Sequence, residues 1–167
     1  MQRKFLDFAK ALNELNVAFC MALLIVIFFF QMCVVLLRYL YSIGHIQLQD
    51  AVSFSFAALC ILAIPTAIRS NAHVRVDIFR EYQSKETRRK FDCVAIIVFT
   101  IPLFCMTFWY AFPLVAYSWS ILEGSRETGG LPGFFLVLTA LPIGCVFMLI
   151  QGLAILLDKK ILHSNEE

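Results

Sequence analysis

Four apolar runs constrain this chain more than any other feature, because each is long enough to cross a bilayer. A hydrocarbon core of about 30 Å takes roughly 20 helical residues, whereas the strands of an outer-membrane barrel would be shorter and would alternate in polarity. The runs therefore predict an all-α integral membrane protein that forms a single domain over residues 1–167. Its four transmembrane helices are expected at about residues 17–40, 50–69, 92–120 and 131–157.

The composition supports a membrane environment. Hydrophobic residues make up 60% of the chain and charged residues 16%, below the roughly 25% usual in soluble domains. Seventeen phenylalanines in 167 residues are more apolar surface than a soluble domain of this size could bury. The formal net charge of +2 gives no reason to expect a nucleic-acid partner.

The long polar segment between the second and third runs, residues 69–91, sets the orientation. It carries seven of the 14 Lys and Arg residues: Arg69, Arg75, Arg80, Lys85, Arg88, Arg89 and Lys90. With the N-terminus inside, this segment shares a side with three basic residues at the start of the chain and two at its end. Only Arg38 and Arg126 then lie on the other side. Because cytoplasmic loops are enriched in Lys and Arg, we expect both termini in the cytoplasm.

Two polar segments also carry apolar residues at helical spacing. Phe5, Phe8, Leu12 and neighbouring apolar positions predict an amphipathic helix that lies on the cytoplasmic surface and then turns into the first span. The basic segment has a similar pattern, so amphipathic cytoplasmic interfacial helices are expected on both.

The third run, at about 42 Å, is too long for a simple span. We expect it either to tilt strongly or to end early, with a kink or break at Pro113.

The polar residues do not assemble into a recognisable reaction centre. The six cysteines are scattered without a CxxC pair, and the three histidines fall in loops or the tail. We expect no catalytic, substrate-binding or metal site in this chain and no cofactor. Gln31 and Gln151, the main polar side chains within the runs, are expected to bond across helices.

Asp50, just before the second run, allows two interpretations. It is a capping or first-turn carboxylate that the helix dipole favours, or it pairs with a cation on a neighbouring helix or subunit.

The segment from Pro65 to Ile78 carries a further pattern, in which His73, Val74, Val76 and Asp77 follow the end of the second run. It resembles the signature of the small membrane subunit (Q-type, DctQ-like) of tripartite ATP-independent periplasmic (TRAP) transporters. Asp50 matches the acidic residue, usually Glu, that opens the second span in that family. Pro142 and Gly144 match a Pro-x-Gly in the final span. The chain departs at Asn71-Ala72, where the family commonly has a Gly.

This resemblance implies a non-catalytic scaffold subunit of a sodium-coupled importer of organic acids, in the bacterial inner membrane. Its partners would be a large TRAP membrane subunit, which holds the sodium and substrate sites, and a periplasmic substrate-binding protein. Sialic acid is the first expectation for the substrate and C4-dicarboxylates the second. The alternatives are a membrane-anchor subunit of a redox complex and a small autonomous exporter.

The residue candidates fall into two groups. Those expected at a subunit contact or in a structural role are Asp50, Arg69, His73, Arg75 and Asp77. Those expected to bind phospholipid headgroups are Arg75, Arg80 and Arg88, since a basic residue near an anionic surface gains about 1 kcal/mol. The simpler interpretation of residues 73–77 is a polar connector below the membrane.

Overall fold

The computed structural model describes residues 2–69, 87, 91 and 93–157. They form the helices α1 (Gln2–Tyr41), α2 (Ile46–Arg69), α4 (Ile101–Ser120) and α5 (Phe134–Leu157), with the π-helix η2 (Ile96–Thr100) before α4. Within these residues there is no strand, only an isolated bridge between Gly124 and Pro132. Four helical segments are long and apolar enough to cross a membrane, so the predicted all-α membrane class is confirmed.

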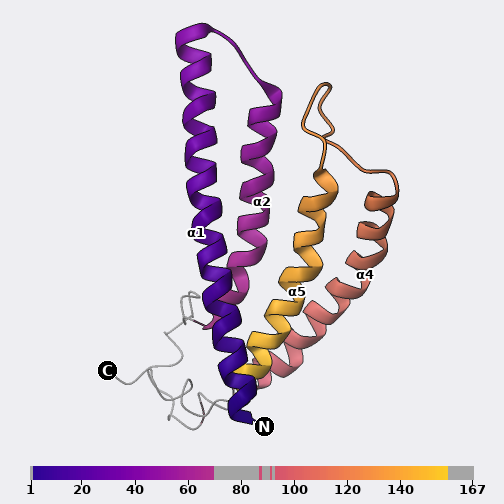
Figure 1. Cartoon of the computed structure of the whole chain (residues 1–167). Helices are drawn as coiled ribbons and strands as arrows, with labels where there is room; N and C mark the ends of the chain where they lie inside the picture. Colours follow the sequence, from indigo (N-terminus) through magenta and orange to yellow (C-terminus); the bar gives the residue numbers. More distant parts are fainter. Residues whose placement is uncertain (1, 70–86, 88–90, 92, 158–167) are drawn as a thin grey trace.

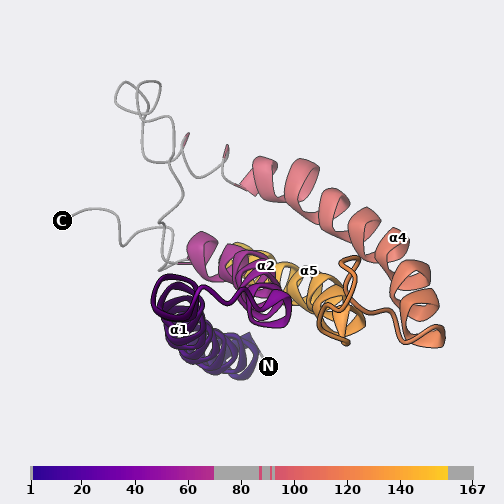
Figure 2. The same cartoon turned by 90° about the horizontal axis from the view of Figure 1, so that it is seen from above.

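The helices stand in an open row rather than a closed bundle. Seen from above, the order is α1, α2, α5 and α4 (Figure 2). α2 packs between α1 and α5, and α4 packs mainly against α5. The chain runs up α1 and down α2, and then up α4 and down α5 (Figure 1). Within the described residues, no further helix covers either broad face of this row.

The first helix differs from the expectation. α1 is continuous over 40 residues, so the predicted turn between an amphipathic surface helix and the first span is absent. A helix of that length reaches about 60 Å, twice the hydrocarbon thickness. No Gly or Pro interrupts residues 2–41. Part of the apolar face of the first half packs on the chain's own helices, with Ala9 fully buried, while Phe8 and Leu15 stay exposed. The chain therefore has no local breaker at the expected turn, and contacts with its own helices hold part of this segment in line with the span.

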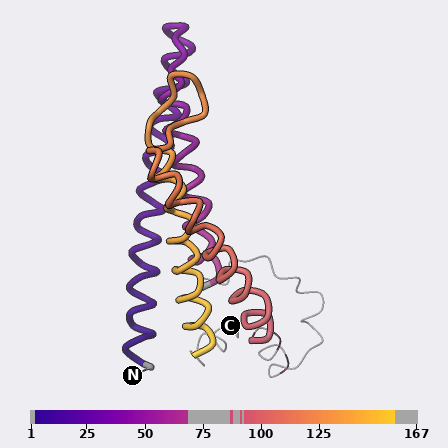
Figure 3. Tube along the Cα trace, turned by 90° about the vertical axis from the view of Figure 1, so that its right-hand side faces the viewer, coloured from indigo at the N-terminus to yellow at the C-terminus, as the bar shows by residue number. Residues whose placement is uncertain are grey.

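The third apolar run forms an inclined helix. Helix continues from Ile96 through η2 and α4 to Ser120 with Pro113 inside it, so the run does not end early. α4 is inclined relative to α1 (Figure 3). A strong tilt of this helix in the bilayer stays a prediction. The π-turn lies where Ile101 N–H bonds back to Ile96 O, directly before Pro102. Proline lacks an N–H and its ring crowds the preceding turn, which favours a widened turn there.

α5 carries most of the core. Its buried residues lie on one face and are mostly small: Ala140, Gly144, Cys145, Met148, Gln151, Gly152, Ala154 and Ile155. Small residues let backbones approach closely, which is how membrane helices gain packing energy. By contrast, many large apolar side chains are exposed, among them Phe29 at 63% and Phe99 at 71%. Exposure on that scale suits lipid or a protein partner, not water.

Candidate functional site

A polar junction joins α1 to α2. Asn16 of α1 is 4% exposed, and its Nδ2 donates to the Leu62 carbonyl oxygen at 2.7 Å and to Thr66 Oγ1 at 2.9 Å. An unpaired amide in an apolar setting costs several kcal/mol, so these bonds fix which turn of α1 faces which turn of α2.

α2 and α5 approach each other closely at the same turn of α2. Pro65, which is fully buried, has no N–H to donate to the carbonyl of Ile61, four residues earlier. That carbonyl oxygen lies against Gly144 of α5, where an ideal β-carbon would fall 3.3 Å from it. The turn of α2 that ends at Pro65 therefore rests directly on the backbone of α5. Pro65 and Gly144, which the sequence places in different runs, belong to a single contact.

Asp50 connects α2 to the segment between α4 and α5. Its Oδ2 accepts a hydrogen bond from Leu131 N–H at 2.9 Å. The capping interpretation is wrong, because α2 begins at Ile46 and has no acidic residue in its first turn. In the described part of the chain the partner is thus a backbone N–H. A role of Asp50 at a subunit contact stays a prediction.

The segment that Asp50 contacts is a compact hairpin, residues 121–133. Ser125 N–H donates to Leu131 O and Gly130 N–H donates to Glu127 O, both at 3.0 Å. Gly130 is packed closely against the side chains of both Asp50 and Ser125. A β-carbon at Gly130 would fall 2.5 Å from Asp50 Oδ2 and 2.5 Å from Ser125 Cβ. The carboxylate of α2 therefore holds the α4–α5 connection in place from outside that helix pair.

Gln151 ties the far end of α5 to α1. This side chain is 1% exposed, and its Nε2 donates to the Ala9 carbonyl oxygen at 2.9 Å. The expectation that Gln151 bonds across helices is confirmed. Gln31 is exposed on α1, and no cross-helix bond of it is seen among the described residues.

The other candidates from the sequence lie at or beyond the end of α2. Arg69 is the last residue of that helix. His73, Arg75, Asp77, Arg80 and Arg88 lie outside the described residues, so their expected roles at a subunit contact or at lipid headgroups stay predictions.

Sequence reasoning did not single out Asn16, and it noted Gly144 only as part of a motif. A signal for Asn16 is present. It is the last strongly polar residue before the first apolar run and lies seven residues after Ala9, on the same helix face. An amide that recurs with a small residue on one face is typical of a helix contact in a membrane.

The described polar groups are structural in kind. Asn16, Asp50 and Gln151 each bond to backbone atoms of another segment. Among the described residues, no group of three or more His, Cys, Asp or Glu is placed to hold a metal ion, and the six cysteines are free thiols. What this arrangement can do chemically is join helices.

These features define a class: a multi-pass membrane protein whose polar side chains serve assembly. The model of the family described as tripartite ATP-independent periplasmic transporters, DctQ component, matches residues 24–159, well over half of the chain. The chain belongs to this family, as the motif around His73 indicated. No curated protein matches it. Family membership makes the chain the small membrane component of a TRAP transporter, a multi-pass protein of the inner membrane, and favours this over the redox-anchor and autonomous-exporter alternatives.

Proposed function

We propose that the chain is the non-catalytic small permease subunit of a sodium-coupled TRAP importer of organic acids, and that it acts as a scaffold for the large transport subunit. The observation that carries this is the use of Asn16, Asp50 and Gln151 in bonds that join separate segments of the chain. A transport site needs polar groups that are free to bind a solute or an ion within the membrane. Polar groups that are already hydrogen-bonded to another segment of the same chain make the subunit rigid instead.

The open row supports the same role. The helices lie in the order α1, α2, α5 and α4 (Figure 2). Large apolar side chains are exposed along this row, so a second membrane protein can pack against it. Helix association in lipid depends on close packing and on a few interhelical hydrogen bonds, both of which this row already uses internally. A preformed row loses little conformational entropy when it docks. Such a subunit enlarges the stationary part against which a mobile domain works.

We place both termini in the cytoplasm. Residues 1–16, 69–91 and 158–167 carry 12 of the 14 basic residues, whereas Arg38 lies in the last turn of α1 and Arg126 in the α4–α5 hairpin. A reporter that is fluorescent only in the cytoplasm tests this when fused after Glu167 or inserted at Gly44. The C-terminal fusion should be bright and the Gly44 insertion dark, and the reverse pattern would refute the orientation.

Sialic acid is the first proposal for the substrate and C4-dicarboxylates the second. Both are organic acids of the kind the resemblance implies, and their selection would belong to the binding protein and the large subunit. The sodium sites would likewise lie in the large subunit. Phospholipids and these two proteins are the proposed partners.

Reconstitution into proteoliposomes tests the scaffold role. Vesicles with the chain alone, the large subunit alone or both receive labelled sialic acid or succinate with the cognate binding protein, under an inward sodium gradient. Uptake should need both membrane subunits and should disappear when sodium is replaced by potassium. Uptake by the chain alone at the rate of the full system would refute the proposal, and full activity of the large subunit alone would remove the need for a scaffold.

A further inference from the structure

A groove between α1 and α2 lies near the turn that joins them. It has a volume of about 580 Å³ and is lined by Gln31, Val34, Val35, Arg38, Tyr39 and Gln49. A second depression of about 480 Å³ adjoins it, shares Val34, Arg38 and Gln49, and extends over the turn to His45. The α1 residues fall on successive turns of one face, and α2 contributes Gln49. We call the first depression the Arg38 groove.

The Arg38 groove lies at one edge of the membrane-spanning part of α1. No charged residue occurs between Glu14 and Arg38, and the apolar run from Val17 to Leu37 spans about 31 Å of helix. This matches the hydrocarbon thickness, so Arg38 stands at the depth of the headgroups. Tyr39 and Tyr41, 83% and 67% exposed, follow it where amphipathic rings are enriched.

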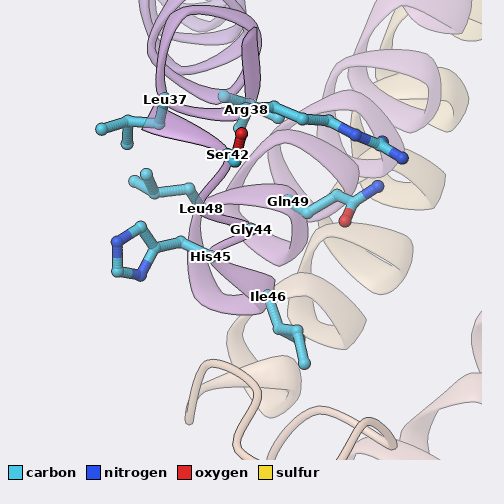
Figure 4. Close-up of a pocket in the computed structure, with 9 residues that line it drawn as sticks. Leu37, Arg38, Ser42, Gly44, His45, Ile46, Leu48 and Gln49 are labelled. Carbon is cyan, nitrogen blue, oxygen red and sulfur yellow. The ribbon is translucent and has the colours of Figure 1, made fainter. Parts of the chain in front are cut away.

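The polar wall of the groove offers hydrogen-bond donors. The guanidinium of Arg38 carries five N–H donors, and the amides of Gln31 and Gln49 each carry two. Figure 4 shows the guanidinium of Arg38 and the amide of Gln49 extending to the same side, while Leu37, Leu48 and His45 point the other way. Of the residues that the structure describes, no Asp or Glu lines the groove. The nearest carboxylate in sequence, Asp50, is engaged with Leu131 N–H of the α4–α5 hairpin.

The other wall of the groove is apolar. Val34 and Val35 lie between Gln31 and Arg38 along α1. Toward the membrane centre, α1 continues with exposed apolar side chains such as Phe28 and Phe29. A soluble anion would leave this wall in contact with nothing. A lipid covers both walls, since its phosphate meets Arg38 and its acyl chains follow the apolar part of α1.

We propose that the Arg38 groove binds a phospholipid, with the headgroup phosphate held by Arg38 and Gln49. The amide of Gln31, two turns nearer the membrane centre, then faces the acceptor oxygens of the glycerol ester region. This accounts for an exposed amide within an apolar run, which would be costly if it faced acyl chains alone. The inference depends on the membrane position of α1 and not on the transport role.

Native mass spectrometry of the full chain in detergent tests the proposal. The probes are dioleoyl phosphatidylglycerol, dioleoylglycerol with the same chains and no phosphate, and soluble glycerol 3-phosphate. Arg38→Gln should weaken phosphatidylglycerol binding about fivefold, the effect of about 1 kcal/mol per basic residue at an anionic surface. Arg38→Lys should retain most of the binding. Gln49→Leu should weaken it about threefold, as expected for one net hydrogen bond.

Arg126→Gln is the matched control, because it removes the same charge at the same end of the molecule and should leave binding unchanged. The proposal is overturned if Arg126→Gln weakens binding as much as Arg38→Gln, since the attraction is then diffuse. If dioleoylglycerol bound as well as phosphatidylglycerol, the phosphate would not contribute to binding. If glycerol 3-phosphate bound as well, the apolar wall would not contribute. A photoreactive residue at Tyr39 that cross-links to the large subunit in the assembled complex, and not to lipid, would assign the groove to that protein instead.

Discussion

Gly144 of α5 lies so close to Ile61 of α2 that a β-carbon on Gly144 would fall 2.7 Å from Ile61 Cγ2. Real β-carbons essentially never come that near another atom, so the hydrogen of glycine is required at this contact. The crowded group is on a β-branched side chain with few rotamers, and the freed carbonyl of the same residue lies next to it. Neither the Ile61 side chain nor its carbonyl can therefore move aside easily to make room for a larger residue at Gly144.

Gly144→Ala should destabilise the fold by about 1–3 kcal/mol, the usual cost of overpacking a close contact. The expected readout is a lower thermal midpoint for loss of the monodisperse protein in detergent. Gly152→Ala is the matched control on the same helix, since its β-carbon would lie at an ordinary 3.6 Å from Ile96 Cγ2. It should leave the midpoint nearly unchanged, and adding Ile61→Ala to Gly144→Ala should recover part of the loss. Equal effects of the two glycine substitutions would contradict the close contact.

Asp50→Ala should loosen the α4–α5 hairpin. The substitution leaves Leu131 N–H without its acceptor, which costs about 1–3 kcal/mol for a partly buried group. Hydrogen exchange across residues 121–133 should become faster, while Ser53→Ala, one turn further along an exposed face of α2, should leave it unchanged. Asp50→Asn keeps an acceptor oxygen, so its exchange rate in residues 121–133 should lie between those of the wild-type chain and Asp50→Ala. Unaltered exchange in Asp50→Ala would contradict the anchoring role.

The same substitution tests the predicted subunit contact of Asp50. If this residue acts only through the hairpin, then Asp50→Ala lowers the yield of the large subunit in co-purification by no more than another substitution that frees the hairpin, such as Gly130→Ala. A much larger loss for Asp50→Ala would indicate direct contact with the partner.

The number and class of the helices were predictable from the sequence, because length and hydropathy decide them locally. The family followed from residues 73–77 together with the span pattern. The bond of Gln151 could be anticipated as well, since a lone amide within an apolar run needs a partner.

What the sequence did not predict depends on distant neighbours. Asn16 meets Leu62, and Asp50 meets Leu131, 46 and 81 residues away, and no local pattern gives those pairings. The continuity of α1 was missed for a related reason. Its amphipathic first half was assigned to the membrane surface, whereas Ala9 and Asn16 pack on α5 and α2. An apolar helix face predicts burial but does not say against what.

Asn16→Ala should weaken the α1–α2 junction. The substitution removes two hydrogen bonds, which in membrane proteins average about 0.6 kcal/mol each, and leaves the Leu62 carbonyl and Thr66 with less compensation. A total loss of about 1–2 kcal/mol is expected in an unfolding titration with a denaturing detergent. Asn13→Ala is the control three residues earlier, because Asn13 Oδ1 is buried without a hydrogen-bond partner among the described residues. It should cost less than Asn16→Ala, and the opposite order would contradict the junction.

Gln151→Leu should release the first half of α1 from α5 without disturbing the α1–α2 hairpin. The leucine keeps most of the side-chain volume but cannot donate to the Ala9 carbonyl, which Gln151 Nε2 meets at 2.9 Å. Within the described residues, no other hydrogen bond is seen from residues 2–15 to another helix, so trypsin should cut after Arg3, Lys4 or Lys10 several times faster than in the wild-type chain. Spin labels on residue 6 and on α5 should report a broader distance distribution, whereas labels on residues 30 and 56 should not. If proteolysis and both distance distributions matched the wild-type chain, packing alone would hold α1 in place and the Gln151 bond would be dispensable.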